Sequence, residues 1–194
     1  MHIMKKLLRI TVLSMLLSIQ VYADDINDFQ IEGISIGDSL LNFASKENID
    51  ANKYDNQNSN DKYIIYKADK FIQIKQYDYL GVTIKKNDIK YIVSSLSGRI
   101  YYKNLNECYK TRKQIKRDLE KIIKFNDIEK KKYKSQDGKA TIYALQLYLK
   151  PYPSLESIVL NCNHYSDKSK FKNNLSVSIN PQEYAFYLIN EAHE

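Results

Sequence analysis

The chain of 194 residues contains no tryptophan, five glycines, three prolines and two cysteines. It has no glycine-rich phosphate loop, and the Gly-x-Ser-x-Gly, His-Glu-x-x-His and Cys-x-x-Cys patterns are also missing. The missing tryptophan disfavours a carbohydrate site. The sequence therefore offers no recognisable catalytic motif, and we expect neither a metal site nor a cofactor.

The first 23 residues indicate where the protein is located. A basic segment with Lys5, Lys6 and Arg9 precedes an apolar run at 10–21, which is followed by the small residue Ala23. This layout is typical of a secretory signal peptide, and the run is shorter than the roughly 20 residues that a membrane-spanning helix needs. We predict cleavage after Ala23, a signal peptide at 1–23, and a single periplasmic or secreted domain at 24–194 with no transmembrane segment.

The net charge of +7 exaggerates how basic this domain is. Three positive charges belong to the predicted signal peptide, so residues 24–194 carry 27 basic and 23 acidic side chains. Such a mild excess is compatible with an anionic partner and does not require one. The many Lys, Asn, Ile and Tyr residues are those that an AT-rich genome produces in excess, so part of the basic character is compositional.

The two cysteines are predicted to form a disulfide, because an exported protein enters an oxidising compartment. Cys108 lies on the apolar stripe of a predicted helix, and Cys162 alternates with apolar residues on a predicted strand. Both side chains should therefore meet between helix and sheet. An alternative is that Cys162 and His164, two apart on one strand face, form a nucleophilic pair or begin a metal site. The disulfide is favoured because His193 is the only other histidine in the mature chain.

Several segments in which apolar and polar residues alternate predict a sheet rich in antiparallel strand pairs. A first strand is expected at 29–36, and four short strands follow one another at 63–67, 71–77, 82–86 and 91–96. Three more are expected at 141–149, 157–162 and 175–179, while 129–138 is predicted to be a polar connection.

One long helix is predicted at about 104–125, because Asn104 and Glu107 have capping-box spacing and the apolar residues fall on one stripe. That stripe comprises Leu105, Cys108, Tyr109, Ile115, Leu119, Ile122 and Ile123. Short helices are expected after Ser39, after Ser45 and after Pro181. The predicted fold class is α+β, an antiparallel-rich sheet packed by one long helix, with a short N-terminal and a C-terminal helix.

The densest basic cluster consists of Lys130, Lys131, Lys132 and Lys134 around Tyr133. Lysines beside an aromatic ring are able to bind phosphate, so these four residues form a candidate anion-binding site, although such a run is also typical of a solvated loop. Because the protein is predicted to be exported, an anionic envelope surface is a better partner than nucleic acid.

Three segments resemble a group of small exported proteins from AT-rich planktonic alphaproteobacteria. They are 29–41, which reads FQIEGISIGDSLL, then 106–110, NECYK, and 190–192, NEA. The resemblance implies export and brings no particular activity with it.

The sequence favours a non-catalytic exported module that binds or interacts with a partner, such as an envelope protein. A structural or assembly factor of the cell envelope is the first alternative, and an enzyme of unrecognised type is the second. A deep pocket with converging polar groups or an exposed apolar patch would separate these hypotheses.

Overall fold

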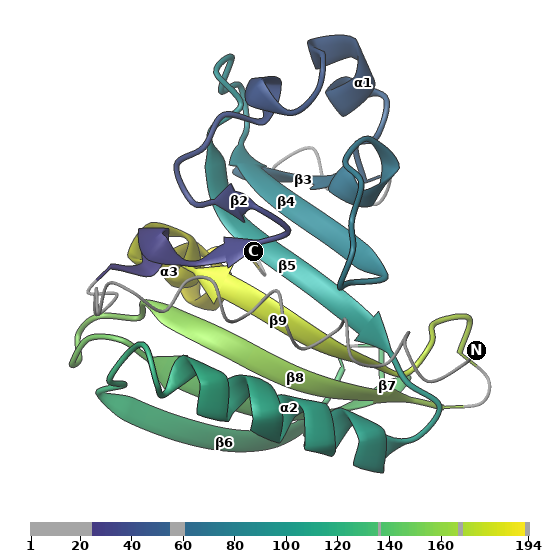
Figure 1. The fold of residues 1–194 in the computed structure, drawn as a ribbon, viewed down its shortest axis with the longest axis vertical. Helices are drawn as coiled ribbons and strands as arrows, with labels where there is room; N and C mark the ends of the chain where they lie inside the picture. The colour runs from purple at the N-terminus through teal and green to yellow at the C-terminus, as the bar shows by residue number, and fades with distance from the viewer. Residues whose placement is uncertain (1–24, 55–60, 136, 167–168, 193–194) are drawn as a thin grey trace, which may run out of the picture.

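Seven antiparallel strands form one twisted sheet in the computed structural model, which describes residues 25–54, 61–135, 137–166 and 169–192 (Figure 1). Their order across the sheet is β3-β4-β5-β9-β8-β7-β6, so β3 and β6 form its edges and β9 lies between β5 and β8. The strands are β3 (Tyr63–Lys67), β4 (Tyr79–Lys85), β5 (Val93–Tyr101), β6 (Asp127–Lys134), β7 (Ala140–Tyr148), β8 (Ser157–Tyr165) and β9 (Asn174–Asn180). The predicted signal peptide lies outside the described residues.

The helix α2 (Leu105–Leu119) lies across one face of the sheet, over β8 and β9 (Figure 1). It begins as predicted, because the side chain of Asn104 accepts a hydrogen bond of 3.1 Å from the backbone N–H of Glu107. Leu105, Ile115 and Leu119 pack against the buried core. The predicted α+β class, with an antiparallel sheet and one long packing helix, is confirmed.

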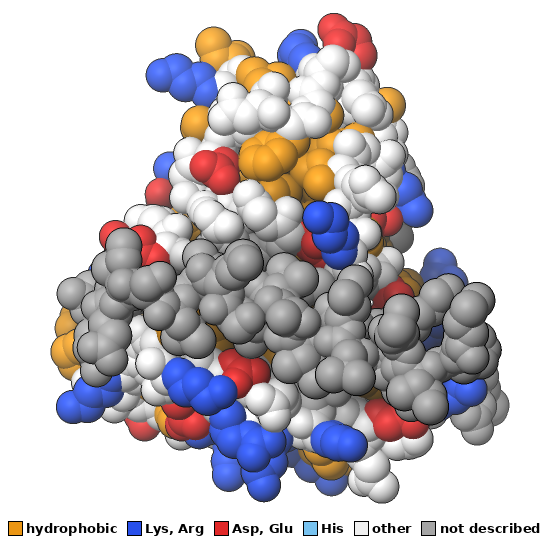
Figure 2. Space-filling view, viewed as in Figure 1, with side chains coloured by type: hydrophobic (Ala, Val, Ile, Leu, Met, Phe, Trp, Pro, Cys, Tyr) orange, Lys and Arg blue, Asp and Glu red, His pale blue; other side chains and the backbone are white. Residues whose placement is uncertain are grey.

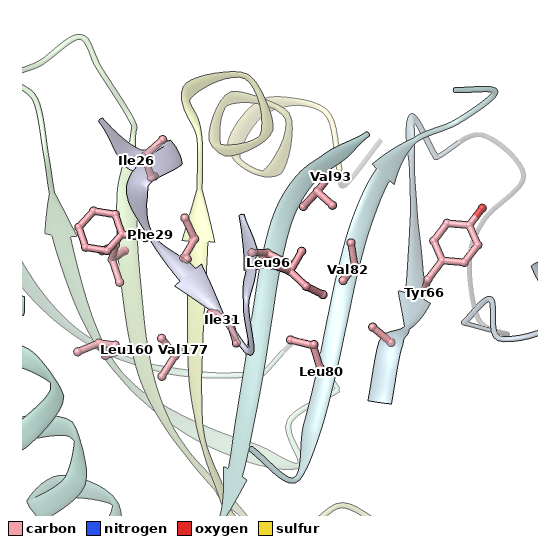
Figure 3. Close-up of a cluster of buried hydrophobic side chains, with 14 of the residues drawn as sticks. Ile26, Phe29, Ile31, Tyr66, Leu80, Val82, Val93, Leu96, Leu160 and Val177 are labelled. Carbon is pink, nitrogen blue, oxygen red and sulfur yellow. The ribbon is translucent and has the colours of Figure 1, made fainter. Parts of the chain in front are cut away.

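The N-terminal segment covers the same face with short elements: η2 (Ile26–Asp28), β1 (Gln30–Ile31), β2 (Ile34–Ser35), η3 (Leu40–Asn42) and α1 (Lys46–Asp50). Figure 3 shows Ile26, Phe29 and Ile31 beside side chains of the sheet such as Leu96 and Val177. The core therefore lies between the sheet and a layer made of α2 and this segment.

The single strand predicted at 29–36 is wrong, since β1 and β2 form a hairpin. Its turn has positive φ angles at Glu32 (55°) and Gly33 (82°), the conformation that a tight two-residue hairpin requires. The helix expected after Ser39 is only the 3-10 turn η3, in which Leu40 is buried while Leu41 is exposed. The short helix expected after Ser45 is present as α1.

The strand predicted at 71–77 is not formed. After η4 (Ala68–Lys70), the backbone N–H groups of Lys75, Gln76 and Tyr77 donate to the carboxylate of Glu32 instead of to a neighbouring strand. A side chain more than 40 residues away in the sequence thus satisfies the backbone donors that a neighbouring strand would otherwise bind.

Two boundaries near α2 also differ from the prediction. The helix ends at Leu119 rather than near Phe125, and the chain turns so that Ile123 is buried while Ile122 is 46% exposed. The polar connection predicted at 129–138 is largely the strand β6, which pairs with β7 along its whole length. This pairing outweighs the weak strand preference of lysine.

The helix α3 (Gln182–Asn190) lies on the opposite side of the sheet from α2. It follows β9 directly after Pro181, and its residue Ala185 is buried. The sheet is therefore covered by α2 on one face and only partly by α3 on the other.

Candidate functional site

The face of the sheet away from α2 is polar along its three central strands. Leu96, Val177 and Leu160 point into the core, so the residues that alternate with them point to the other side. These are Ser95, Ser97, Arg99 and Tyr101 on β5; Asn174, Ser176, Ser178 and Asn180 on β9; and Ser157, Val159, Asn161 and Asn163 on β8.

A cavity of about 600 Å³ lies on this face. Small residues such as Gly81, Ser97 and Ser178 form its floor, and α3 contributes Leu188 and Ile189 to its lining. Its walls carry five tyrosines: Tyr54, Tyr79, Tyr133, Tyr148 and Tyr184. Because the residues on the floor are small and those around it are large, this face of the sheet is hollow rather than flat. We call this hollow the concave site.

The hydroxyl groups of two floor residues, Ser97 and Ser178, and of the neighbouring Ser176 form a short network across the strands. The Oγ atom of Ser97 lies 3.3 Å from that of Ser176 and 3.2 Å from that of Ser178. The buried Oδ1 atom of Asn161, which also lines the cavity, has no hydrogen-bond partner among the described residues. This oxygen has less than 1 Å² of accessible surface, so it is a costly internal group beneath the floor rather than one that a bound molecule contacts.

The two charged side chains among the described lining residues are Arg99 and Lys131. Lys131 lies 2.8 Å from the carboxylate of Glu129, and its hydrogen bond holds the pKa of Glu129 below the usual range. The guanidinium of Arg99 lies 4.6 Å from the ring centroid of Tyr79 and makes no ion pair with a described carboxylate. Arg99 is therefore the cation that is available to an anionic group.

Gly81, two residues after Tyr79 on β4, leaves room for the Tyr79 ring. A Cβ atom at Gly81 would lie 3.1 Å from the ring of Tyr79, closer than such contacts usually are. Burial raises the pKa of Tyr79, so its hydroxyl remains a neutral donor and acceptor at ordinary pH. The glycine lets the tyrosine ring lie over the floor, and that ring in turn supports Arg99.

The two cysteines lie on the opposite face, away from the concave site. The Sγ atoms of Cys108 on α2 and Cys162 on β8 are 2.01 Å apart, at disulfide distance, and both side chains are buried. The alternative that paired Cys162 with His164 as a nucleophile finds no support, since the Cys162 sulfur is directed at Cys108. In the part of the chain that the structure describes, no group of three or more His, Cys, Asp or Glu residues could hold a metal ion.

The four predicted anion-binding lysines do not lie together. They are on the edge strand β6, where alternation places Lys131 in the concave site and Lys130, Lys132 and Lys134 toward the α2 side. On that side Lys132 lies 5.3 Å from the ring centroid of Tyr143. Figure 2 views the α2 side and shows Lys and Arg side chains gathered over α2 at its lower edge. Anion binding by the four residues stays a prediction.

The floor residues were missed by the sequence analysis, although the sequence contains a signal for them. Residues 174–180 place Asn or Ser at every second position, and serine or asparagine also occupies most of the alternate positions in 157–163 and the first two in 95–101. Asparagine is normally depleted in strands, so its repeated occurrence on one face of β8 and β9 is the unusual feature.

None of the described helices is long and apolar enough to cross a membrane. Comparison of the chain with protein families, with curated proteins and with solved structures found no match.

Proposed function

We propose that the protein is an exported, non-catalytic binding module that holds its ligand in the concave site. The observation that carries this proposal is the cavity of about 600 Å³ with a hydroxyl- and amide-lined floor and tyrosine walls. Ligand sites in proteins are hollows of about 300–1,000 Å³ with a few converging polar groups. The size and the lining both fit.

The chemistry of the lining supports binding of a polar molecule with an apolar or planar part. Serine hydroxyls donate and accept hydrogen bonds, and the side-chain amide of Asn180 in the same lining can do both as well. The tyrosine rings add flat apolar surfaces with polar tips. The floor lies on the interior strands β5, β9 and β8, whose backbones are paired on both sides, so the site is held rigidly.

Export is the second part of the proposal. It rests on the layout of residues 1–23 and on the resemblance to small exported proteins, and it places the mature domain in the periplasm or outside the cell. The sulfur atoms of Cys108 and Cys162 at bonding distance are compatible with an oxidising compartment.

The binding proposal is tested with the mature chain 24–194 and two tryptophan variants. Ser178→Trp fills the floor of the cavity, whereas Lys113→Trp adds the same side chain to the exposed surface of α2. Saturation-transfer NMR is recorded with a panel of neutral sugars, uronic acids, amino acids, dicarboxylates and phosphate esters.

We expect at least one compound to bind the parent protein and Lys113→Trp, and to lose its signal with Ser178→Trp. Thermal melting shows whether each variant is folded. A panel without any binder, or a binder that Ser178→Trp retains, would overturn the proposed site.

A further inference from the structure

The concave site continues beyond Arg99 into two smaller hollows. Arg99 also lines a hollow of about 180 Å³ together with Tyr101, Phe171 and Lys172. The last three residues line a further hollow of about 390 Å³, which reaches Lys103. The three hollows therefore share lining residues and follow β5 toward the connection between β8 and β9.

The charged side chains in this extension are all positive. Arg99, Lys103, Lys170 and Lys172 line the two smaller hollows, and the described lining contains no aspartate or glutamate. None of these four makes an ion pair with a described carboxylate, while nine other cations do. An anionic ligand would meet favourable charge along the whole extension.

Aromatic rings accompany these cations. The ammonium of Lys172 lies 5.5 Å from the ring centroid of Tyr101, and that of Lys170 lies 5.5 Å from the ring centroid of Phe171. Tyr101 and Phe171 are 40% and 43% exposed. Each pair presents a flat apolar surface next to a positive charge, as Arg99 and Tyr79 do in the concave site.

We propose that the concave site and its extension bind an acidic oligosaccharide, with one carboxylate at Arg99 and further sugar units over Tyr101 and Phe171. The proposal rests on the proposed binding function and names its ligand class. Sugar hydroxyls both donate and accept hydrogen bonds, and this matches the serine hydroxyls of the floor, which do the same. The chain contains no tryptophan, so the aromatic surfaces for stacking against sugar rings come from tyrosine and phenylalanine.

Two other polyanions fit the site less well. Polyphosphate oxygens only accept hydrogen bonds, so they cannot use the acceptor capacity of the serine hydroxyls that line the floor. An extended acidic peptide binds a sheet through unpaired backbone groups at an edge strand, whereas β5, β8 and β9 are interior strands. Both ligands serve as competing outcomes in the experiment.

The experiment is isothermal titration calorimetry of the mature chain with tetragalacturonate, galacturonate, maltotetraose, tripolyphosphate and hexaglutamate. Two variants remove cations from the site, Arg99→Gln and Lys172→Gln. Each has a matched control on the exposed surface of α2, Arg117→Gln for the arginine and Lys113→Gln for the lysine.

We expect tetragalacturonate to bind best and to bind more tightly than galacturonate. Arg99→Gln should weaken it by about tenfold and Lys172→Gln by about threefold, with both controls within about twofold of the parent. Its affinity should fall as sodium chloride rises from about 50 to about 200 mM, because exposed charges are screened.

Three results would overturn the inference. Maltotetraose binding that Arg99→Gln leaves intact, and that Ser178→Trp abolishes, would keep the binding function and reject the acidic ligand. Tighter binding of tripolyphosphate or hexaglutamate would reject the sugar. Equal affinity for galacturonate and its tetramer would reject the extension past Arg99.

Discussion

The side chain of Glu32 accepts a hydrogen bond of 3.0 Å from the backbone N–H of Tyr77, 45 residues further along the chain. The same carboxylate accepts from Gln76 at 2.6 Å and from Lys75 at 3.0 Å. It joins the N-terminal hairpin to the segment that leads into β4. The carboxylate of one residue in a tight turn thus accepts the hydrogen bonds that a neighbouring strand would otherwise accept from this segment.

The first prediction is that Glu32→Ala lowers the free energy of unfolding by about 2 kcal/mol, because three backbone donors lose a charged acceptor. Glu120→Ala is the matched control. Glu120 pairs with Lys116 on the surface of α2, and its loss should cost less than about 1 kcal/mol. Urea denaturation measures both. Equal effects of the two substitutions would show that the carboxylate of Glu32 adds nothing beyond an ordinary surface pair.

The second prediction concerns Gly98, above which the ring of Tyr77 lies. A Cβ atom there would be 2.4 Å from Tyr77 Cδ1, so Gly98→Ala should cost about 1–3 kcal/mol through overpacking. Gly81→Ala meets the outer part of the Tyr79 ring at 3.1 Å and should cost less. In a Tyr77→Ala background the penalty of Gly98→Ala should disappear, since no ring remains to be displaced. A penalty that persists in the double variant would contradict this packing.

The third prediction is a loss of stability at alkaline pH. Burial, with a smaller contribution from Glu32, raises the pKa of Tyr77 from 10.0 to about 12. Between these values the unfolded chain binds fewer protons than the folded protein, so the free energy of unfolding falls as pH rises from 10 to 12. Tyr77→Phe should reduce this fall by on the order of 2 kcal/mol. Tyr152→Phe, at a side chain that is 90% exposed, should leave it unchanged. Identical pH profiles for the two variants would refute the assignment.

The fourth prediction is that Cys108 and Cys162 form a disulfide in the exported protein. The bond would close a loop with a sequence separation of 54 residues, for which loop-closure entropy gives about 4 kcal/mol of stabilisation. Reduction should therefore lower the melting temperature markedly. Thiol counting on the denatured, unreduced mature protein should find no free thiol. Two free thiols would contradict the predicted disulfide.

The fifth prediction is that the mature chain begins at Asp24. Mass spectrometry of the protein from its native host should show this N-terminus, because cleavage after Ala23 follows the signal-peptide pattern. A mature pool that retains Met1 would contradict export by this route.

The sequence predicted those parts of the fold in which local pattern and tertiary packing agree. The strand at 141–149 is close to β7, and 175–179 lies within β9, because their apolar residues alternate and all face one core. The helix start at Asn104 followed from a local hydrogen bond between its side chain and Glu107.

The remainder depended on partners far apart in the sequence. Residues 71–77 alternate like a strand, yet their backbone donors bind Glu32. Residues 129–138 were predicted to be a polar connection, yet a complete register with β7 makes 129–134 part of the strand β6. The concave site was missed for a similar reason, since its floor reads as an ordinary solvated sheet face and its walls come from Tyr54, Tyr133 and α3.

The lysines of β6 have a consequence for colloidal behaviour. An edge strand offers unpaired backbone groups to any other strand, and so invites fibrils and sheet-to-sheet adhesion. At the β3 edge the chain protects itself, because Tyr54 and Lys67 form backbone hydrogen bonds across that edge with Ile65 and Asn52. The β6 edge is protected by charge instead. This strand carries four lysines, Lys130, Lys131, Lys132 and Lys134. A second copy that approached this edge would bring like charges together, so the least strand-like sequence in the sheet disfavours association of one sheet with another.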